Sequence, residues 1–205
     1  MLEFLFEQYK TYPAYEIVLE LTAILFGLLS VWFAKKNNIW VFPTGIINTA
    51  IYVYLLWKWT LLGDMMINFY YVVMSIYGWY HWTRKKDNVA EFPISGMNAS
   101  EKKWSLIIFV LTILFVVVVY TIFDKFTHWT SYVDTFVTGI FFVGMWLMAK
   151  RKIENWILWI VGDIISIPMY FAKGYTFTSI QYLIFTIIAI YGYLEWKRIL
   201  QEKKA

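Results

Sequence analysis

Cysteine is absent from this chain of 205 residues, and only two histidines and four prolines are present. Without cysteine the protein can form no disulfide bond, thiol nucleophile or cysteine metal site, and the redox state of its compartment stays undecided. His81 and His128 lie far apart without acidic clusters beside them, so we expect no metal and no cofactor. The sequence also lacks a glycine-rich phosphate loop, a nucleophile elbow and the zinc-protease motif. These absences predict that the protein is not an enzyme.

Charge is scarce as well, because only 16% of the residues are charged, whereas 60% are hydrophobic and 22% aromatic. A soluble domain has about 45–50% apolar and about 25% charged residues. Apolar runs such as Trp104 to Phe123 have the length, about 20 residues, that the core of a lipid bilayer requires. We therefore expect an integral membrane protein. Charged and aromatic residues alternate from Met1 to Glu16, so no cleavable signal peptide is expected.

Apolar runs and their polar boundaries predict seven membrane spans. The spans are residues 17–34, 39–57, 64–82, 104–123, 132–149, 155–172 and 176–196. If the connections alternate between sides, four of the eighteen Lys and Arg residues lie on the side of the amino terminus and fourteen on the other. The positive-inside rule then predicts a cytoplasmic carboxyl terminus and an amino terminus outside the cell. Because this rule accounts for the net charge of +4, we expect no nucleic-acid partner.

The two halves of the chain resemble each other. The segment YGWYHWTR from Tyr77 matches YGYLEWKR from Tyr191 at an offset of 114 residues. The middle spans align ambiguously, since one alignment pairs Asn38 with Asn155 and another pairs Asn48 with Asp163. The repeat is typical of transporters in which duplicated bundles enclose a substrate site near the midplane of the membrane.

We expect an all-α membrane fold with two parallel three-helix repeats. The repeats are residues 17–86 and 132–198, and a linking helix at residues 104–123 gives both the same orientation. The segment from Lys85 to Lys103 is polar and contains Pro and Gly, so it is interpreted as a flexible cytoplasmic linker.

Polar residues inside the spans point to a binding site, because such residues are costly in a bilayer. Helical spacing places Asn155, Trp159 and Asp163 on one face of the sixth span, and similar rows occur on the second, third and seventh spans. An isolated amide or hydroxyl is more often a contact between helices. Rows that combine amides, aromatic rings and a carboxyl favour a cavity for a ring with attached hydroxyls. The candidate substrate-binding residues are Asn48, Asn68, Tyr71, Trp79, Asn155, Trp156, Trp159, Asp163, Gln181 and Tyr182.

Three segments resemble the PnuC family, bacterial transporters of the vitamin precursor nicotinamide riboside. They are YGWYHW at Tyr77–Trp82, ENWILW at Glu154–Trp159 and QYLIFTIIAIYGYLEW at Gln181–Trp196, and the resemblance covers essentially the whole chain. It implies facilitated diffusion of nicotinamide riboside through a central site, with cytoplasmic phosphorylation that traps the product. It also implies a duplicated SWEET-like bundle, a homotrimer and a place in the bacterial inner membrane. A related branch carries thiamine, and other nucleosides are alternatives.

Asp163 suits a cationic ligand. A pyridinium or thiazolium ring would favour the ionised carboxyl, and Trp159 could add a cation–π contact. We expect Asp163 to act as a counter-charge or as an acceptor for a ribose hydroxyl. Proton-coupled uptake through Asp163 is an alternative, although the spans offer no relay of other titratable groups. A membrane enzyme would need a nucleophile, base or metal grouping that the spans do not supply.

Overall fold

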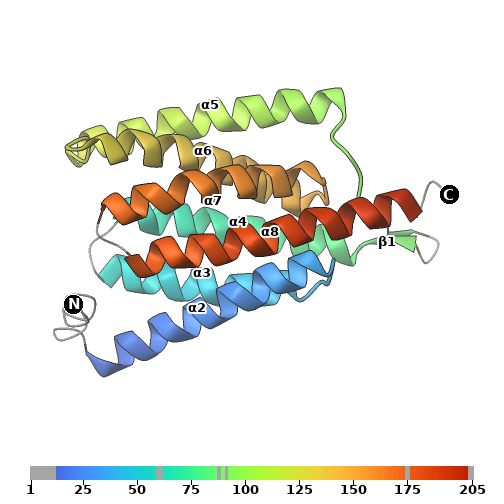
Figure 1. Ribbon diagram of the computed structural model, residues 1–205, viewed down its shortest axis with the longest axis horizontal. Coiled ribbons are helices and arrows are strands. Elements are labelled where there is room, and N and C mark those ends of the chain that lie inside the picture. The colour runs from blue at the N-terminus through green and yellow to red at the C-terminus, as the bar shows by residue number, and fades with distance from the viewer. Residues whose placement is uncertain (1–12, 59–61, 87–88, 91, 174–175, 203–205) are drawn as a thin grey trace.

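Seven helices make up most of the described part of the chain (Figure 1). The computed structural model describes residues 13–58, 62–86, 89–90, 92–173 and 176–202. The helices are α2 (Ala14–Lys35), α3 (Val41–Lys58), α4 (Leu62–Thr83), α5 (Ala99–Ile122), α6 (Trp129–Ala149), α7 (Glu154–Ala172) and α8 (Thr176–Glu202). Two short strands, β1 (Lys85–Lys86) and β2 (Val89–Ala90), pair in antiparallel fashion between α4 and α5. The expected all-α fold is confirmed, with this small strand pair added.

The helices coincide with the predicted spans to within three residues, except where α5 and α8 extend further at the polar ends. By length and composition alone, α2, α5, α6 and α7 are apolar enough to cross a membrane. The helices α3, α4 and α8 lie beside them in the same bundle and alternate with them in direction (Figure 1). Some of the polar residues of these three helices, such as Asn48, Asn68 and Gln181, face the interior of the bundle, as described below.

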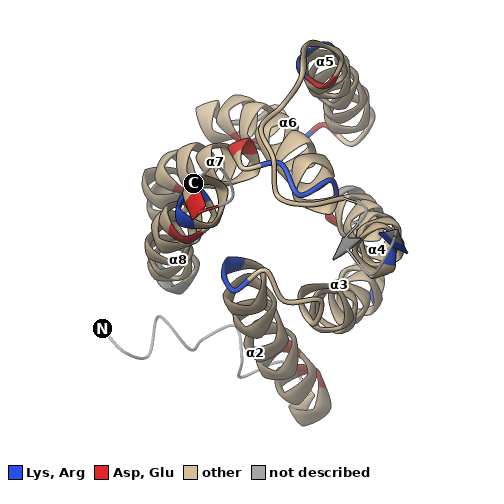
Figure 2. Ribbon diagram, turned by 90° about the vertical axis from the view of Figure 1, so that its right-hand side faces the viewer, with Lys and Arg blue, Asp and Glu red and all other residues tan. Residues whose placement is uncertain are grey.

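Six helices form a closed ring, and α5 lies outside it (Figure 2). Around the ring the order is α2, α3, α4, α6, α7 and α8, and α8 packs back onto α2. We call α2–α4 the first triplet and α6–α8 the second triplet. The triplets meet at two seams, α4–α6 and α8–α2, which are similar in extent. Helix α5 packs mainly on α6, and its passage along the bundle lets the second triplet run in the same direction as the first.

One end of the bundle, which we call the basic end, holds most of the described Lys and Arg residues. It contains the ends of α2, α4, α6 and α8, and Figure 2 looks onto it. Lys35 and Lys36 close α2, Lys150 and Arg151 follow α6, and Arg198 lies in the last turns of α8. The opposite end carries Lys58 and Lys173. Lys58 forms a salt bridge with Glu16 at 2.6 Å, and Lys173 forms one with Asp134 at 3.6 Å. The charge asymmetry expected from the sequence is therefore an asymmetry of the folded bundle.

The first helices of the two triplets end in the same way. After α2, Asn37 N–H donates to Ala34 O and Asn38 N–H to Phe33 O, and after α6 the corresponding bonds run from Arg151 to Met148 and from Lys152 to Leu147. This is the Schellman motif, in which the residue after the helix adopts positive φ. Asn37 has φ 50° and Arg151 has φ 53°. An asparagine tolerates that conformation, whereas for other non-glycine residues it costs roughly 1–2 kcal/mol.

The turns that lead into the middle helices α3 and α7 also have equivalent hydrogen bonds, and the residues that form them are 114 positions apart in sequence. Val41 N–H donates to Asn38 O and Phe42 N–H to Ile39 O, as Asn155 N–H donates to Lys152 O and Trp156 N–H to Ile153 O. Both alignments that the sequence suggested for the middle spans are therefore wrong, because Asn38 corresponds to Lys152 and Asn48 to Gly162. The two turns before the middle helices therefore have the same length.

The segment between α4 and α5, expected to be a flexible linker, is partly fixed against the basic end. We call residues 92–98 the strap. Ser95 N–H donates to Arg151 O at 3.1 Å, and Ile153 N–H donates to Ser95 O at 3.0 Å. Ile94 is buried in the same apolar cluster as Trp82 and Trp196. Local composition did not reveal this order, because the partners of the strap lie more than fifty residues further along the chain.

Candidate functional site

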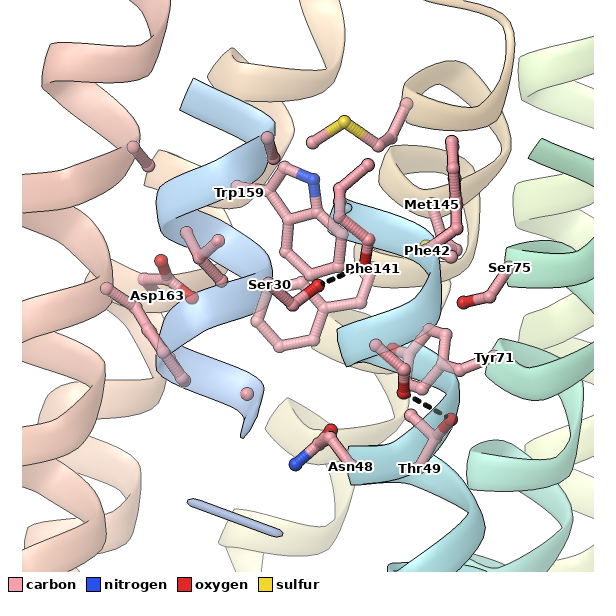
Figure 3. Close-up of a pocket in the computed structure, with 18 of the residues that line it drawn as sticks. Ser30, Phe42, Asn48, Thr49, Tyr71, Ser75, Phe141, Met145, Trp159 and Asp163 are labelled. Carbon is pink, nitrogen blue, oxygen red and sulfur yellow. Dashed lines mark hydrogen bonds between the residues drawn. The ribbon is translucent and has the colours of Figure 1, made fainter. Parts of the chain in front are cut away.

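A cavity of about 290 Å³ lies at the centre of the ring (Figure 3). All six ring helices contribute to its lining, and α5 does not. From the first triplet it is lined by Gly27, Ser30, Val31, Ala34, Val41, Phe42, Gly45, Asn48, Thr49, Tyr52, Asn68, Tyr71 and Ser75. From the second triplet it is lined by Phe141, Met145, Met148, Trp156, Trp159, Asp163, Gln181, Tyr182, Phe185 and Ala189.

The structure brings eight of the ten candidate residues together in this lining. They are Asn48, Asn68, Tyr71, Trp156, Trp159, Asp163, Gln181 and Tyr182. The other two lie elsewhere. Trp79 is 41% exposed on the outside of the bundle, and Asn155 is fully buried, with its amide donating to Lys152 O. Asn155 is only one turn from Trp159, but it precedes the cavity and belongs to the helix start at the basic end.

Sequence reasoning missed the contribution of the first helix of each triplet. Ser30 and Gly27 from α2 and Phe141 and Met145 from α6 line the cavity. The spans that contain them have no amide side chain and no central carboxyl, which were the signals used to select candidate residues. A weak signal was available in α6, where Gly139 and Gly144 flank Phe141 and mark a helix that others approach closely.

The second triplet supplies an aromatic wall. Phe141 stacks on Trp159 with ring centroids 5.1 Å apart and planes 26° from parallel. Phe141 is also parallel to Tyr182 at 6.1 Å, and Tyr182 stacks on Tyr170 at 5.0 Å. Gly162 makes this arrangement possible, because a Cβ at that position would collide with the Phe141 ring. A flat ring entering the cavity therefore meets a continuous face of parallel aromatic side chains.

The first triplet supplies a polar wall. The Asn48 amide donates to Ala23 O at 2.7 Å, which directs its own carbonyl oxygen elsewhere and fixes the side chain. Gly27 leaves room for this contact, since a Cβ there would lie 3.0 Å from the Asn48 nitrogen. Ser30 donates to Val41 O at 2.8 Å and Thr49 to Gly45 O at 2.8 Å, so both hydroxyl oxygens retain acceptor capacity (Figure 3).

Asp163 projects from α7 toward the cavity and is only 3% exposed (Figure 3). No Lys or Arg is among the described residues that line the cavity, and within the described chain no ion pair involves Asp163. The indole nitrogens of Trp156 and Trp159 are buried and likewise have no hydrogen-bond partner among the described residues. A buried carboxyl and two buried donors without partners carry a free-energy cost that a bound polar ligand could offset.

Four aromatic side chains close the cavity toward the basic end. Trp82 meets Phe42 edge to face at 4.9 Å, and Trp196 meets Trp156 in the same way at 5.5 Å. All four are buried, and these two pairs are equivalent at the offset of 114 residues. Arg151 covers the Trp82 ring at 4.1 Å, outside the membrane spans, where burial lowers the pKa of its guanidinium to about 10. Arg151 therefore stays charged at neutral pH.

The described residues contain no group of three His, Cys, Asp or Glu side chains placed to hold a metal ion. The described residues that line the cavity offer aromatic rings for stacking, amides and hydroxyls for hydrogen bonding, and one carboxyl group.

Comparison with known proteins agrees with this architecture. The sequence is similar to the nicotinamide riboside transporter PnuC of Escherichia coli (strain K12), with 24% identity over 212 residues that cover 90% of this chain and 87% of the relative. It is also similar to the riboflavin/roseoflavin transporter RibM of Streptomyces davaonensis, with 21% identity over 192 residues, 93% of this chain and 89% of the relative. The crystal structure of the vitamin B3 transporter PnuC shares the fold, with a TM-score of 0.67, 23% identity and coverage of 98% of this chain and 90% of that chain.

The sequence pattern of one family matches residues 17–198. This range extends from α2 into α8 and includes every residue that lines the cavity. The protein thus belongs to the nicotinamide mononucleotide transporter family.

Proposed function

We propose that the protein carries nicotinamide riboside across the membrane through the central cavity. The observation that carries this proposal is the pairing of an aromatic wall with a polar wall around one unpaired carboxyl group. Nicotinamide riboside has a flat, positively charged pyridinium ring and a hydroxylated sugar, so each half of the ligand finds a matching wall. Membership of a family whose relatives include nicotinamide riboside transporters supports the assignment.

The pyridinium ring would stack on Phe141 or Trp159, with Asp163 as its counter-charge. A cation over an aromatic face gains about 0.5–2 kcal/mol, more where water is excluded. The ribose hydroxyls would bind to Asn48, Asn68 and Gln181, whose amides line the cavity. A mononucleotide would add a phosphate group, for which the described lining residues offer no basic side chain, so the riboside is the better ligand.

Transport is proposed to be facilitated diffusion, with phosphorylation inside the cell trapping the product. One carboxyl in the cavity offers no evident proton relay among the described residues that line it, which favours passive movement over proton coupling through Asp163. The basic end would face the cytoplasm in the bacterial inner membrane, and the amino terminus would lie outside. The proposed units are repeats at residues 17–86 and 132–198 with a linking helix at 104–123, assembled as a homotrimer.

Riboflavin and thiamine are the alternative substrates. The relative RibM is named for riboflavin and roseoflavin, and a flavin ring would also stack on the aromatic wall. The flavin is neutral, however, and would leave the Asp163 carboxyl unpaired. Thiamine carries a positive thiazolium ring and would satisfy Asp163, but it offers fewer hydroxyls to the polar wall.

Ligand binding by the purified protein in detergent tests these proposals directly. Calorimetry should give saturable binding of nicotinamide riboside and at least tenfold weaker binding of thiamine, riboflavin and nicotinamide mononucleotide, a difference of about 1.4 kcal/mol or more. Tighter binding of riboflavin or thiamine would move the assignment to that vitamin. Binding of none of the four would refute the proposal.

A further inference from the structure

The two seams between the triplets are closed at the basic end by equivalent hydrogen bonds. The Trp82 indole on α4 donates to Ala149 O at the end of α6, at 3.2 Å. The Trp196 indole on α8 donates to Ala34 O near the end of α2, at 3.1 Å. Because the aromatic layer formed by these residues closes the cavity, a ligand can leave by the basic end only if at least one seam separates.

Only the α4–α6 seam is reinforced by the strap. Arg151, just beyond α6, stacks its guanidinium on the Trp82 ring at 4.1 Å and donates to Phe92 O at 3.0 Å. The backbone bonds of Ser95 to Arg151 and Ile153 join the strap to the same turn. Arg151 thus links α4, the strap and α6 in one buried contact, and it does so from a strained, positive-φ backbone.

The first turn of α5 strengthens this attachment. Glu101 bonds to both Lys150 and Lys152 at 3.1 Å, and its side chain also forms a capping box with Asn98. Met97 N–H donates to Glu154 at 2.9 Å, and Lys152 donates to the Ser95 hydroxyl at 2.9 Å. These contacts hold the strap and the start of α5 to the turn between α6 and α7, and Arg151 joins that turn to Trp82 on α4.

The α8–α2 seam has fewer ties at this end. Among the described residues, the polar contacts across it are the Trp196–Ala34 hydrogen bond, the approach of Lys35 to the Tyr191 ring at 5.0 Å and the electrostatic attraction between Lys35 and Glu195. The cavity reaches this seam between two small side chains, Ala34 and Ala189, whereas Met145 and Met148 on α6 occupy the lining near the other seam. Separation here would open a path directly beside the small residues.

We infer that the bundle opens at its basic end on one side only, and that the ligand leaves between α8 and α2. The α4–α6 seam stays closed and acts as the fixed side about which the triplets move. This inference rests on the proposed transport function, but it concerns the direction of opening and not the identity of the ligand. A symmetric motion would instead have to break the stacking of Arg151 on Trp82 in every cycle, in addition to the Trp82–Ala149 hydrogen bond.

Pairs of spin labels can test this, because the chain has no native cysteine. The pair Lys36→Cys/Lys197→Cys spans the α8–α2 seam. The pair Thr83→Cys/Ser100→Cys joins the end of α4 to the start of α5. All four positions are exposed. In liposomes without ligand, double electron–electron resonance should give a broader distance distribution for the first pair. Saturating nicotinamide riboside should shift the populations of the first pair and leave the second unchanged.

Two further variants test whether the contacts of Arg151 keep the α4–α6 seam closed. Arg151→Gln removes the Trp82 and Phe92 contacts and should broaden the Thr83/Ser100 distribution, whereas Arg84→Gln, at the exposed end of the same seam, should not. A broad or ligand-sensitive Thr83/Ser100 pair in the otherwise native chain would overturn the inference. So would a narrow, fixed Lys36/Lys197 pair in protein that still takes up the riboside. If the riboside fails to bind, the distributions without ligand still decide which seam opens.

Discussion

Asp163 is the residue that we expect to select a positively charged ligand. It is nearly buried, it faces the cavity, and no basic side chain among the described lining residues neutralises it. The stacked rings of Phe141 and Trp159 line the same cavity, and the indole nitrogens of Trp156 and Trp159 have no hydrogen-bond partner among the described residues. A ligand cation would supply the missing charge. A carboxyl that served only as a hydrogen-bond acceptor could be replaced by an amide at little cost.

Asp163→Asn should weaken binding of nicotinamide riboside about tenfold, or by about 1.4 kcal/mol. It should leave binding of a neutral isostere, in which an uncharged ring replaces the pyridinium, nearly unchanged. Titration calorimetry of both ligands on both proteins measures the difference. Equal losses for the two ligands would assign Asp163 a hydrogen-bonding role, and no loss for either would remove it from the site.

A pair of exchanged positions makes the two walls different. At the offset of 114 residues, Gly27 corresponds to Phe141 and Asn48 to Gly162. The first triplet places its larger residue on the middle helix, where Gly27 makes room for Asn48. The second triplet places it on the first helix, where Gly162 makes room for Phe141. The same backbone pocket thus holds an amide in one triplet and a ring in the other.

Gly27→Ala should displace the Asn48 amide and weaken ribose binding, because the new Cβ would lie 3.0 Å from the Asn48 nitrogen. Loss of one such hydrogen bond should cost roughly 0.5–1.5 kcal/mol. Calorimetry should show the loss for nicotinamide riboside and a smaller one for a ligand that lacks ribose hydroxyls. Gly144→Ala is the matched control, since its Cβ would meet Trp159 at an ordinary 3.4 Å. Unchanged riboside binding by Gly27→Ala would mean that Asn48 does not contact the sugar.

Much of the cavity could be predicted from spacing along single helices. Rows at three- and four-residue intervals identified Asn48, Asn68, Trp159 and Asp163 without knowledge of the fold. Phe141 could not be found in this way, because its place depends on a glycine 21 residues further along, on another helix. Trp79 shows the opposite error: it continues a polar row, but the helix turns it outward.

At the scale of helices, close approach depends on glycines opposite large rings. Gly78 on α4 faces Phe42, and its equivalent Gly192 on α8 faces Trp156, so that both rings of the closing layer lie against bare backbone. Helix boundaries were predictable because polar residues end each apolar run. The ordered structure of the strap was not predictable, since its hydrogen bonds join segments distant in sequence.

Gly192→Ala should destabilise the protein, because its Cβ would lie 2.6 Å from the Trp156 ring. Overpacking costs about 1–3 kcal/mol, against a gain in helix propensity of about 1 kcal/mol. The melting temperature in detergent should fall by roughly 2–6 °C, measured by intrinsic fluorescence. Gly144→Ala should melt at or above the temperature of the native protein. Equal stability of the two variants would contradict the tight α7–α8 packing.

At the scale of the whole molecule, the charge asymmetry predicts the direction of insertion. A single cysteine at exposed Ser100 lies at the basic end, and one at exposed Asp124 lies at the opposite end. In intact cells, a membrane-impermeant maleimide should label Asp124→Cys and should reach Ser100→Cys only after the membrane is permeabilised. The reverse pattern would place the basic end outside and contradict the positive-inside assignment.

The arrangement of the whole molecule also predicts whether transport can concentrate the ligand inside the cell. Six helices surround one carboxyl, and the described lining residues include no second carboxyl, His, Lys or Arg that could pass a proton onward. Proteoliposomes should therefore take up radiolabelled nicotinamide riboside until the internal and external concentrations are equal, at a rate independent of an imposed pH gradient. Adding a riboside kinase and ATP to the lumen should raise total accumulation severalfold without changing the initial rate at low substrate. Empty liposomes provide the background. Accumulation above the external concentration without the kinase, or acceleration by an inward proton gradient, would show that Asp163 couples transport to protons.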